Sequence, residues 1–121
     1  MTVTVNIVYF PGTNCQAETA DAFAAVGARP RHVFLADVLD DKARLDDADI
    51  LCLPGGFSFG DHIASGIVAA KFLTTRLADQ LADCRQRPMI CICNGFQIAV
   101  RAGIFGAGVA LTVNDRGTFH H

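Results

Sequence analysis

Four short runs of apolar, largely β-branched residues alternate along this chain with stretches of helical spacing, and this alternation constrains the fold more than any other feature. The runs cover residues 3–10, 31–35, 49–53 and 88–93. Parallel strands need long crossover connections, usually helices, whereas antiparallel strands can be joined by short turns. The alternation therefore predicts an α/β domain built on a parallel sheet. One more strand is expected at Val109–Val113.

The predicted helices follow three of these strands, and the last of them covers residues 94–102, before Gly103. The first helix is predicted to start at the capping-box pattern Thr13-x-x-Gln16 and to stop at Gly27. Its expected inward side chains are Ala20, Phe23, Ala24 and Val26. One continuous helix is predicted after the third strand, because apolar positions recur there in helical steps. Those positions are Ile63, Ile67, Ala70, Thr74, Leu77 and Leu81.

Length and composition exclude several classes of protein. The chain has 121 residues, the size of one domain, and 51% of them are hydrophobic, which is enough to bury a core. Its net charge of −2, without a basic stripe, argues against a nucleic-acid binder. The N-terminal residues lack the pattern of a secretory signal, and no apolar run approaches the ~18 residues of a membrane span. We expect a cytoplasmic protein with no nucleic-acid or membrane partner, and its apolar composition is compatible with an oligomer.

The cysteines give no sign of a disulfide framework or of a metal site. Five are present, an odd number, which fits free thiols in a reducing compartment. Cys91-x-Cys93 together with Cys84 fits no standard zinc spacing, so we expect no metal. Cys15, Cys52, Cys84 and Cys91 are expected to be structural.

Six of the twelve acidic residues lie between Asp37 and Asp49. Such a run can bind a divalent cation, but carboxylates in a solvated loop or short helix are the more common case. We expect a solvated loop or short helix here. The single glutamate, Glu18, falls early in the first predicted helix, where it can interact with the positive end of the helix dipole.

Cys93 is the strongest candidate for a nucleophile. It ends an apolar strand and is followed at once by Asn94-Gly95 and a helix, which is the arrangement of a nucleophile elbow. A helix N-terminus stabilises a thiolate, and its free backbone N–H groups can donate to an oxyanion. The alternative is that Cys93 is a small buried apolar side chain. The local sequence leaves both interpretations open.

A glycine-rich segment follows the third strand at residues 54–61 (PGGFSFGD). Adjacent glycines allow backbone N–H groups to approach a phosphate or an oxyanion closely, although a plain turn is the simpler interpretation. The Lys of a P-loop is absent, which disfavours a nucleotide phosphate site. The loops at Pro11–Asn14, Pro54–Asp61 and Cys93–Gly95 should all lie at the carboxyl ends of strands, where open α/β sheets bind ligands.

Taken together and in order, three motifs resemble the glutaminase subunits of phosphoribosylformylglycinamidine synthase, which are class I (triad-type) glutamine amidotransferases. They are FPGTNC at residues 10–15, PGGFSFGD at 54–61 and ICNGFQI at 92–98, and NDRGTF at 114–119 is also similar. The resemblance implies a flavodoxin-like parallel sheet with helices on both faces. It also implies that residues 1–121 are the N-terminal part of a glutamine amidotransferase domain.

The resemblance further implies a glutaminase mechanism for purine biosynthesis. Cys93 would attack the side-chain amide of L-glutamine, giving a γ-glutamyl thioester and ammonia. Backbone N–H groups of Gly55, Gly56 and Asn94 would hold the oxyanion, and the glutamine pocket would be lined by Phe57, Ser58 and Gln97. The chain would bind no cofactor directly, because ATP and Mg would belong to a large synthase subunit, to which a small third subunit is a bridge.

Two departures from that family stand out. Its members usually have Gly two residues before the nucleophile, where this chain has Cys91, a larger side chain that can crowd the turn. The base and its orienting acid come from a downstream His-x-Glu segment, which this chain lacks. His32 and His62 do not match that base, and His120 and His121 are not in a His-x-Glu context.

We therefore expect weak or no activity of the chain alone, which would lack the C-terminal His-x-Glu portion of the domain. Two alternatives are a non-catalytic amidotransferase-like scaffold or binding module and a DJ-1/PfpI-like cysteine hydrolase or redox sensor. The Asn-Gly-Phe-Gln sequence after Cys93 favours a glutamine enzyme over the last of these.

Overall fold

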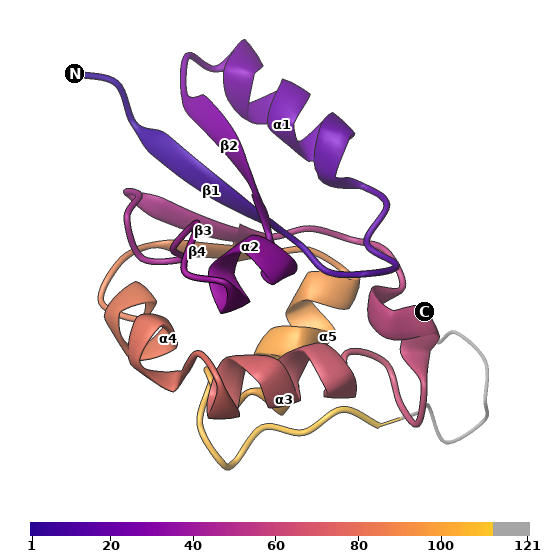
Figure 1. The fold of residues 1–121 in the computed structure, drawn as a ribbon. Coiled ribbons are helices and arrows are strands. Elements are labelled where there is room, and N and C mark those ends of the chain that lie inside the picture. The colour runs from indigo at the N-terminus through magenta and orange to yellow at the C-terminus, as the bar shows by residue number, and fades with distance from the viewer. Residues whose placement is uncertain (113–121) are drawn as a thin grey trace.

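A computed structural model describes residues 1–112 of the chain, and its centre is a four-stranded parallel sheet (Figure 1). The strands are β1 (Thr4–Tyr9), β2 (Arg29–Phe34), β3 (Ile50–Leu53) and β4 (Met89–Cys91). Their order across the sheet is β2-β1-β3-β4, and every neighbouring pair is parallel. This order is typical of flavodoxin-like sheets, which confirms the predicted fold class.

Helices cover both faces of the sheet, as predicted. Figure 1 shows α1 on one side and α3, α4 and α5 on the other. The helical elements are α1 (Gln16–Ala25), α2 (Leu35–Leu39), the 3₁₀ helix η1 (Ser58–Asp61), α3 (Ile67–Thr75), α4 (Ala78–Cys84) and α5 (Asn94–Arg101). No helix within the described residues is long and apolar enough to span a membrane.

Each face of the sheet has its own apolar core, because side chains alternate along a strand. Val8, Leu51 and Leu53 point into the larger cluster, which also contains buried residues of α3, α4 and α5. Ile7 and Cys52 point to the opposite face, where they pack with residues of α1. The sheet is thus held from both sides, which fixes the positions of the loops at its carboxyl edge.

The start of α1 differs from the prediction. Cys15, not Thr13, is the residue that precedes the helix, and its side chain caps no backbone group. The Thr13 hydroxyl instead accepts a hydrogen bond from the Phe10 N–H at 3.1 Å. Thr13 also forms an antiparallel bridge with Gly56. The capping-box prediction was wrong because Thr13 serves the loop between β1 and α1.

The inward face of α1 is narrower than predicted. Ala20 is buried and Phe23 is half-buried, but Ala24 is exposed and Val26 is 82% exposed. Val26 fails to reach the sheet because the helix ends one residue before it, at Ala25. Ala24 lies beside the stripe formed by Ala20 and Phe23, on the side that faces solvent.

The single helix predicted over residues 63–81 is two helices. Ile63 is 92% exposed and lies outside any helix. Residues 58–61 form η1 and a turn follows, so α3 begins only at Ile67. Leu77 has φ −122° and ψ 23°, which are not helical values, and separates α3 from α4. Thr74 is exposed, contrary to the prediction. The predicted positions that are at least half-buried are Ile67, Ala70, Leu77 and Leu81.

The last two strand predictions also need correction. β4 ends at Cys91, because Ile92 and Cys93 already belong to the turn into α5. No strand forms over residues 109–112, so the prediction of a strand at Val109–Val113 is wrong there, and Val113 lies outside the described residues.

The acidic segment is a short helix followed by turns, as expected. Its carboxylates interact with nearby donors: Arg31 with Asp47 at 3.0 Å, Lys42 with Asp40 at 3.8 Å and Arg44 with Asp46 at 2.8 Å. The first two pairs join exposed side chains, so each contributes little to stability, whereas the Asp46 side chain of the third pair is only 8% exposed. Within residues 1–112, no group of three or more His, Cys, Asp or Glu side chains is placed to hold a metal ion.

Candidate active site

The three loops after β1, β3 and β4 meet at the carboxyl edge of the sheet, as predicted. The first two are joined by backbone hydrogen bonds: the Phe57 N–H donates to the Gly12 carbonyl at 3.0 Å, and the Cys15 N–H donates to the Gly55 carbonyl at 3.2 Å. The third loop is attached to the second through Ser58 and Asn94. Together the loops enclose a pocket of about 490 Å³.

This pocket lies at the topological switch point of the sheet. The connection after β1 runs to β2 on one side, whereas the connection after β3 runs to β4 on the other. A crevice forms where two such connections diverge, and ligands bind there in this class of fold. The lining residues are Asn14, Cys15, Thr19, Gly55, Gly56, Phe57, Asp61, Ser65, Ile92, Cys93 and Gln97.

Five of the seven predicted site residues line this pocket, and two do not. The lining residues among them are Gly55, Gly56, Phe57, Cys93 and Gln97. Ser58 and Asn94 are buried, at 2% and 1% exposure, and are absent from the lining. The Ser58 hydroxyl oxygen has no hydrogen-bond partner among the described residues.

Cys93 occupies the sharp turn between β4 and α5. Its φ of 52° and ψ of −110° are unusual for a residue with a side chain, and they are the type of strained turn on which a nucleophile elbow depends. The Gly95 N–H donates to the Ile92 carbonyl at 2.8 Å and closes the turn. The side chain of Cys93 is exposed to the pocket, so the alternative of a buried apolar cysteine is wrong.

Gly95 lets the start of α5 press against the end of β3. A Cβ atom at this position would lie 1.9 Å from the carbonyl oxygen of Leu53. Cys91, which replaces the glycine usual in the resembling family, is half-buried and pairs with Leu53 in the sheet. Its side chain packs against the larger core, and Cys93 still adopts the elbow conformation.

The predicted oxyanion donors are placed around this turn. Gly56 has φ 143°, and a Cβ atom there would lie 2.7 Å from the Asn14 nitrogen, so the loop approaches its neighbour as only glycine allows. The Gly56 N–H donates to no acceptor within the part of the chain that the structure describes. Asn94 is the first residue of α5, where backbone N–H groups have no intrahelical partner.

The Asn94 side chain connects the glycine-rich loop to the elbow. Its Oδ1 accepts a hydrogen bond from the Ser58 N–H at 3.0 Å. Its Nδ2 donates to Gln97 Oε1 at 3.2 Å and to Asp61 Oδ1 at 3.4 Å. Sequence reasoning missed this network, and it missed Asp61, because nothing in the local pattern shows which loops a buried amide joins.

Of the other four cysteines, Cys52, Cys84 and Cys91 face a core and Cys15 faces the pocket. Burial raises the pKa of Cys52 to about 12 and that of Cys84 to about 11. Burial also raises the pKa of Cys91. Cys15 is exposed and lines the pocket, so it is not surrounded by a core as the other three are, and its structural role stays a prediction. Its place in the loop after β1 was the signal that could have identified it as a pocket residue.

None of the pocket-lining residues is a histidine. His32 lies on β2 and His62 directly follows η1, and both side chains are exposed. His120, His121 and the motif at residues 114–119 lie outside the described residues. The pocket as described therefore contains a candidate nucleophile and oxyanion donors but no imidazole base.

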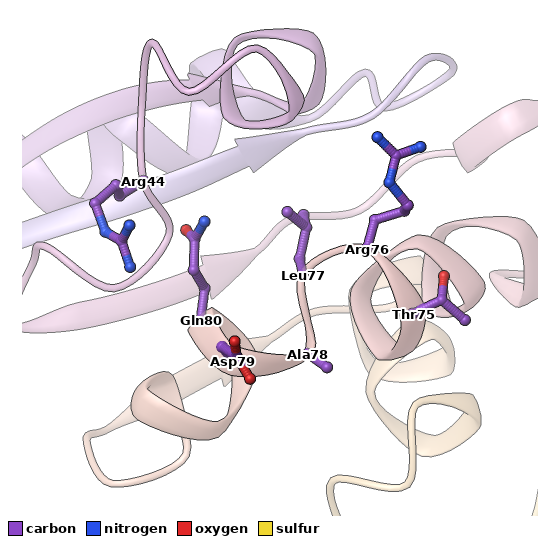
Figure 2. Close-up of a pocket in the computed structure, with 7 residues that line it drawn as sticks. All are labelled: Arg44, Thr75, Arg76, Leu77, Ala78, Asp79 and Gln80. Atoms are coloured by element: carbon purple, nitrogen blue, oxygen red, sulfur yellow. The ribbon is translucent and has the colours of Figure 1, made fainter.

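A second pocket, of about 250 Å³, lies between the loop after α2 and the junction of α3 and α4 (Figure 2). Arg44 Nε and Nη2 donate to the two carboxylate oxygens of Asp46 at 2.8 and 2.9 Å, and this hydrogen bonding lowers the pKa of Asp46. The Leu45 N–H donates to Gln80 Oε1 at 2.8 Å. Figure 2 shows Arg76 on the far side of Leu77 from Arg44. The Leu45–Gln80 hydrogen bond attaches the loop to α4. The pocket shares no lining residue with the candidate active site.

Comparison with known proteins agrees with this geometry. The model of the CobB/CobQ-like glutamine amidotransferase domain matches residues 2–121. The phosphoribosylformylglycinamidine synthase subunit PurQ of Methanopyrus kandleri is 34% identical over 116 residues, which cover 94% of this chain and 48% of the relative. The PurQ subunit of Thermotoga maritima is 38% identical over 115 residues, which cover 93% of this chain and 49% of the relative.

A solved structure matches as well. It is the structure of PurLQS from Thermotoga maritima, with a TM-score of 0.72 and 33% identity over 85% of this chain and 45% of that chain. The chain spans about half the length of the curated relatives it matches. By its sequence and its fold, the chain belongs to the CobB/CobQ-like glutamine amidotransferase family.

Proposed function

We propose that this chain carries the nucleophile of a glutaminase that supplies ammonia to phosphoribosylformylglycinamidine synthase in de novo purine biosynthesis. The observation that carries the proposal is Cys93, a strained and exposed cysteine at the pocket formed by three loops. The similarity to PurQ subunits supports the identity of the substrate as L-glutamine.

The proposed reaction begins at the side-chain amide of glutamine. The Cys93 thiolate attacks the amide carbon and forms a C–S bond, while the carbonyl oxygen becomes an oxyanion. Backbone N–H groups of Gly55, Gly56 and Asn94 stabilise that charge. The C–N bond then breaks, the nitrogen takes a proton and leaves as ammonia, and water hydrolyses the γ-glutamyl thioester to glutamate and free Cys93.

We assign the remaining predicted residues to the shape of the pocket. Phe57 is 61% exposed at the pocket and offers an apolar surface to the methylene groups of glutamine. Gln97 is oriented by its hydrogen bond from Asn94, with its amide nitrogen left to contact substrate. Ser58 is buried, so its contribution is to hold the loop through its N–H rather than to touch substrate.

The proton transfers require an imidazole base, and none of the described pocket-lining residues is a histidine. The thiol must lose a proton and the departing nitrogen must gain one. We propose that this base comes from outside residues 1–112, which makes the activity dependent on the complete assembly.

The proposed assembly contains a large synthase subunit that binds ATP and Mg and receives the ammonia, and a small bridging subunit. The solved relative, a PurLQS assembly, supports this partnership. This chain would need no cofactor of its own and would act in the cytoplasm.

Replacement of Cys93 by Ala in the complete synthase complex tests the proposal. Glutamine-dependent synthesis should be lost, because the thioester cannot form. Synthesis from added ammonium salt should remain, because free ammonia bypasses this site. Cys84→Ala is the matched control, since Cys84 is buried on α4 away from the pocket. Unchanged glutamine-dependent turnover in the Cys93→Ala complex would refute the proposed function.

A further inference from the structure

Asp61 is the one charged side chain among the described residues that line the candidate active site. It ends η1, and its φ of 54° is in the left-handed region. Aspartate tolerates that conformation better than most residues. The loop after β3 therefore brings a carboxylate into a pocket whose other lining residues carry thiols or uncharged polar and apolar groups.

The negative charge of Asp61 has no cationic partner within residues 1–112. Its carboxylate accepts one hydrogen bond, from Asn94 Nδ2 at 3.4 Å, and that amide is uncharged. The ion pairs of the described chain involve other carboxylates, those of Asp40, Asp46 and Asp47. An ionised carboxylate has room for several hydrogen bonds, so Asp61 has acceptor sites left for a cationic ligand.

The position of this charge matches one end of the proposed substrate. Asp61 contacts the side chain of Asn94, and Asn94 directly follows the nucleophile Cys93. Glutamine carries an α-ammonium group separated from its reacting amide by a short aliphatic chain. With the amide at Cys93, the rest of the molecule would occupy the pocket that Asp61 also lines.

We propose that the Asp61 carboxylate binds the α-ammonium group of the substrate and thereby makes the site selective for amides of α-amino acids over simple amides. This inference rests on the proposed function. The competing role is that Asp61 only positions Asn94, in which case every substrate would be affected alike.

Two diazo ketones that alkylate Cys93 separate these roles. One has the skeleton of L-glutamine, and the other is identical but lacks the α-amino group. The unmodified chain should react with the amino reagent at least about 10-fold faster, the usual size of a charge-assisted hydrogen bond. That preference should shrink in about 1 M salt, because a partly exposed ion pair is screened. Asp61→Asn should slow the amino reagent by about the same factor and leave the other reagent unchanged.

The matched control is Asp79→Asn, an exposed aspartate that lies outside this pocket, which should change neither rate. Equal reaction of Cys93 with both reagents in the unmodified chain, which needs no variant, would overturn the role of Asp61 and leave the proposed function standing. Equal slowing of both reagents in Asp61→Asn would assign Asp61 to positioning and overturn the inference. If neither reagent modified Cys93 in the complete synthase complex either, the proposed function itself would fail, and the role of Asp61 with it.

Discussion

Cys93 is held in its strained conformation by the residues around it. A conformation of this kind costs on the order of 1–3 kcal/mol and persists only where neighbouring contacts determine it. Here the Gln97 N–H donates to the Cys93 carbonyl at 3.1 Å, and the Gly95 N–H closes the turn onto Ile92. The buried Asn94 side chain adds a connection to the loop that carries Ser58. The thiol is therefore presented to the pocket by a rigid turn.

The thiols should differ sharply in reactivity. At pH 8, iodoacetamide should modify Cys15 and Cys93 first, because both are exposed. Cys52 and Cys84 should stay unmodified, since burial raises the pKa of these thiols to about 12 and about 11 and the thiolate is the reactive form. Their modification should begin only as the pH approaches those values or the chain unfolds, as peptide mapping would show. Modification of Cys52 as fast as that of Cys93 in native buffer would contradict the structure.

The roles of single residues were harder to predict from the sequence than the elements or the fold. Cys93 could be identified from its sequence because a nucleophile elbow is a local feature, built by a strand, a glycine and a helix start. Asp61 and the side-chain role of Asn94 could not be identified from the sequence, because each depends on contacts between loops far apart in the chain. The Asn94–Ser58 bond, for example, spans 36 positions.

At the scale of elements, the site depends on how closely α5 approaches β3. Gly95 packs against the Leu53 carbonyl, and Gly66, before α3, packs against Ile98 of α5, where an added Cβ atom would lie 2.9 Å from the Ile98 nitrogen. These two contacts fix α5 between the sheet and α3. The orientation of the helix that follows Cys93 is thus set by glycines at two interfaces.

Gly95→Ala should destabilise the fold and disturb the elbow. The added Cβ would lie 1.9 Å from a backbone oxygen that cannot rotate away, so α5 must shift. We expect a loss of about 3 kcal/mol in the free energy of unfolding, as for severe overpacking, measured by urea denaturation. Gly108→Ala is the control, because a Cβ there meets nothing within 4 Å. Equal stability of the two variants would show that the contact between Gly95 and Leu53 is not rigid.

Element types were predictable and element ends were not. The alternation of strand and helix patterns predicted the parallel sheet correctly, because hydrophobic periodicity and β-branched content are local properties of the sequence. The single helix predicted over residues 63–81 is two helices, because the backbone of Leu77 leaves the helical conformation. The apolar spacing of the sequence continues through Leu77, so it gave no sign of the break. The capping-box prediction failed because Thr13 bonds to Phe10 and pairs with Gly56, a partner remote in sequence.

At the scale of the whole molecule, the strand order places the pocket at the switch point between β1 and β3, and the two core clusters hold the loops from either face. An apolar hollow of about 400 Å³ lies beside the site, between α1 and Ile92. β4 forms one edge of the sheet, and the chain spans about half the length of its relatives. The proposed function requires that residues 1–112 present a formed nucleophile to glutamine.

Alkylation by the glutamine-like diazo ketone measures whether Cys93 is such a nucleophile. The chain should gain a single adduct, mapped by mass spectrometry to Cys93, and an excess of L-glutamine should slow its formation. Cys93→Ser should abolish the adduct, whereas Cys15→Ser should retain it, which separates the two exposed thiols of the pocket. An adduct on Cys15 in place of Cys93, or a rate that L-glutamine leaves unchanged, would show that Cys93 is not a glutamine-directed nucleophile.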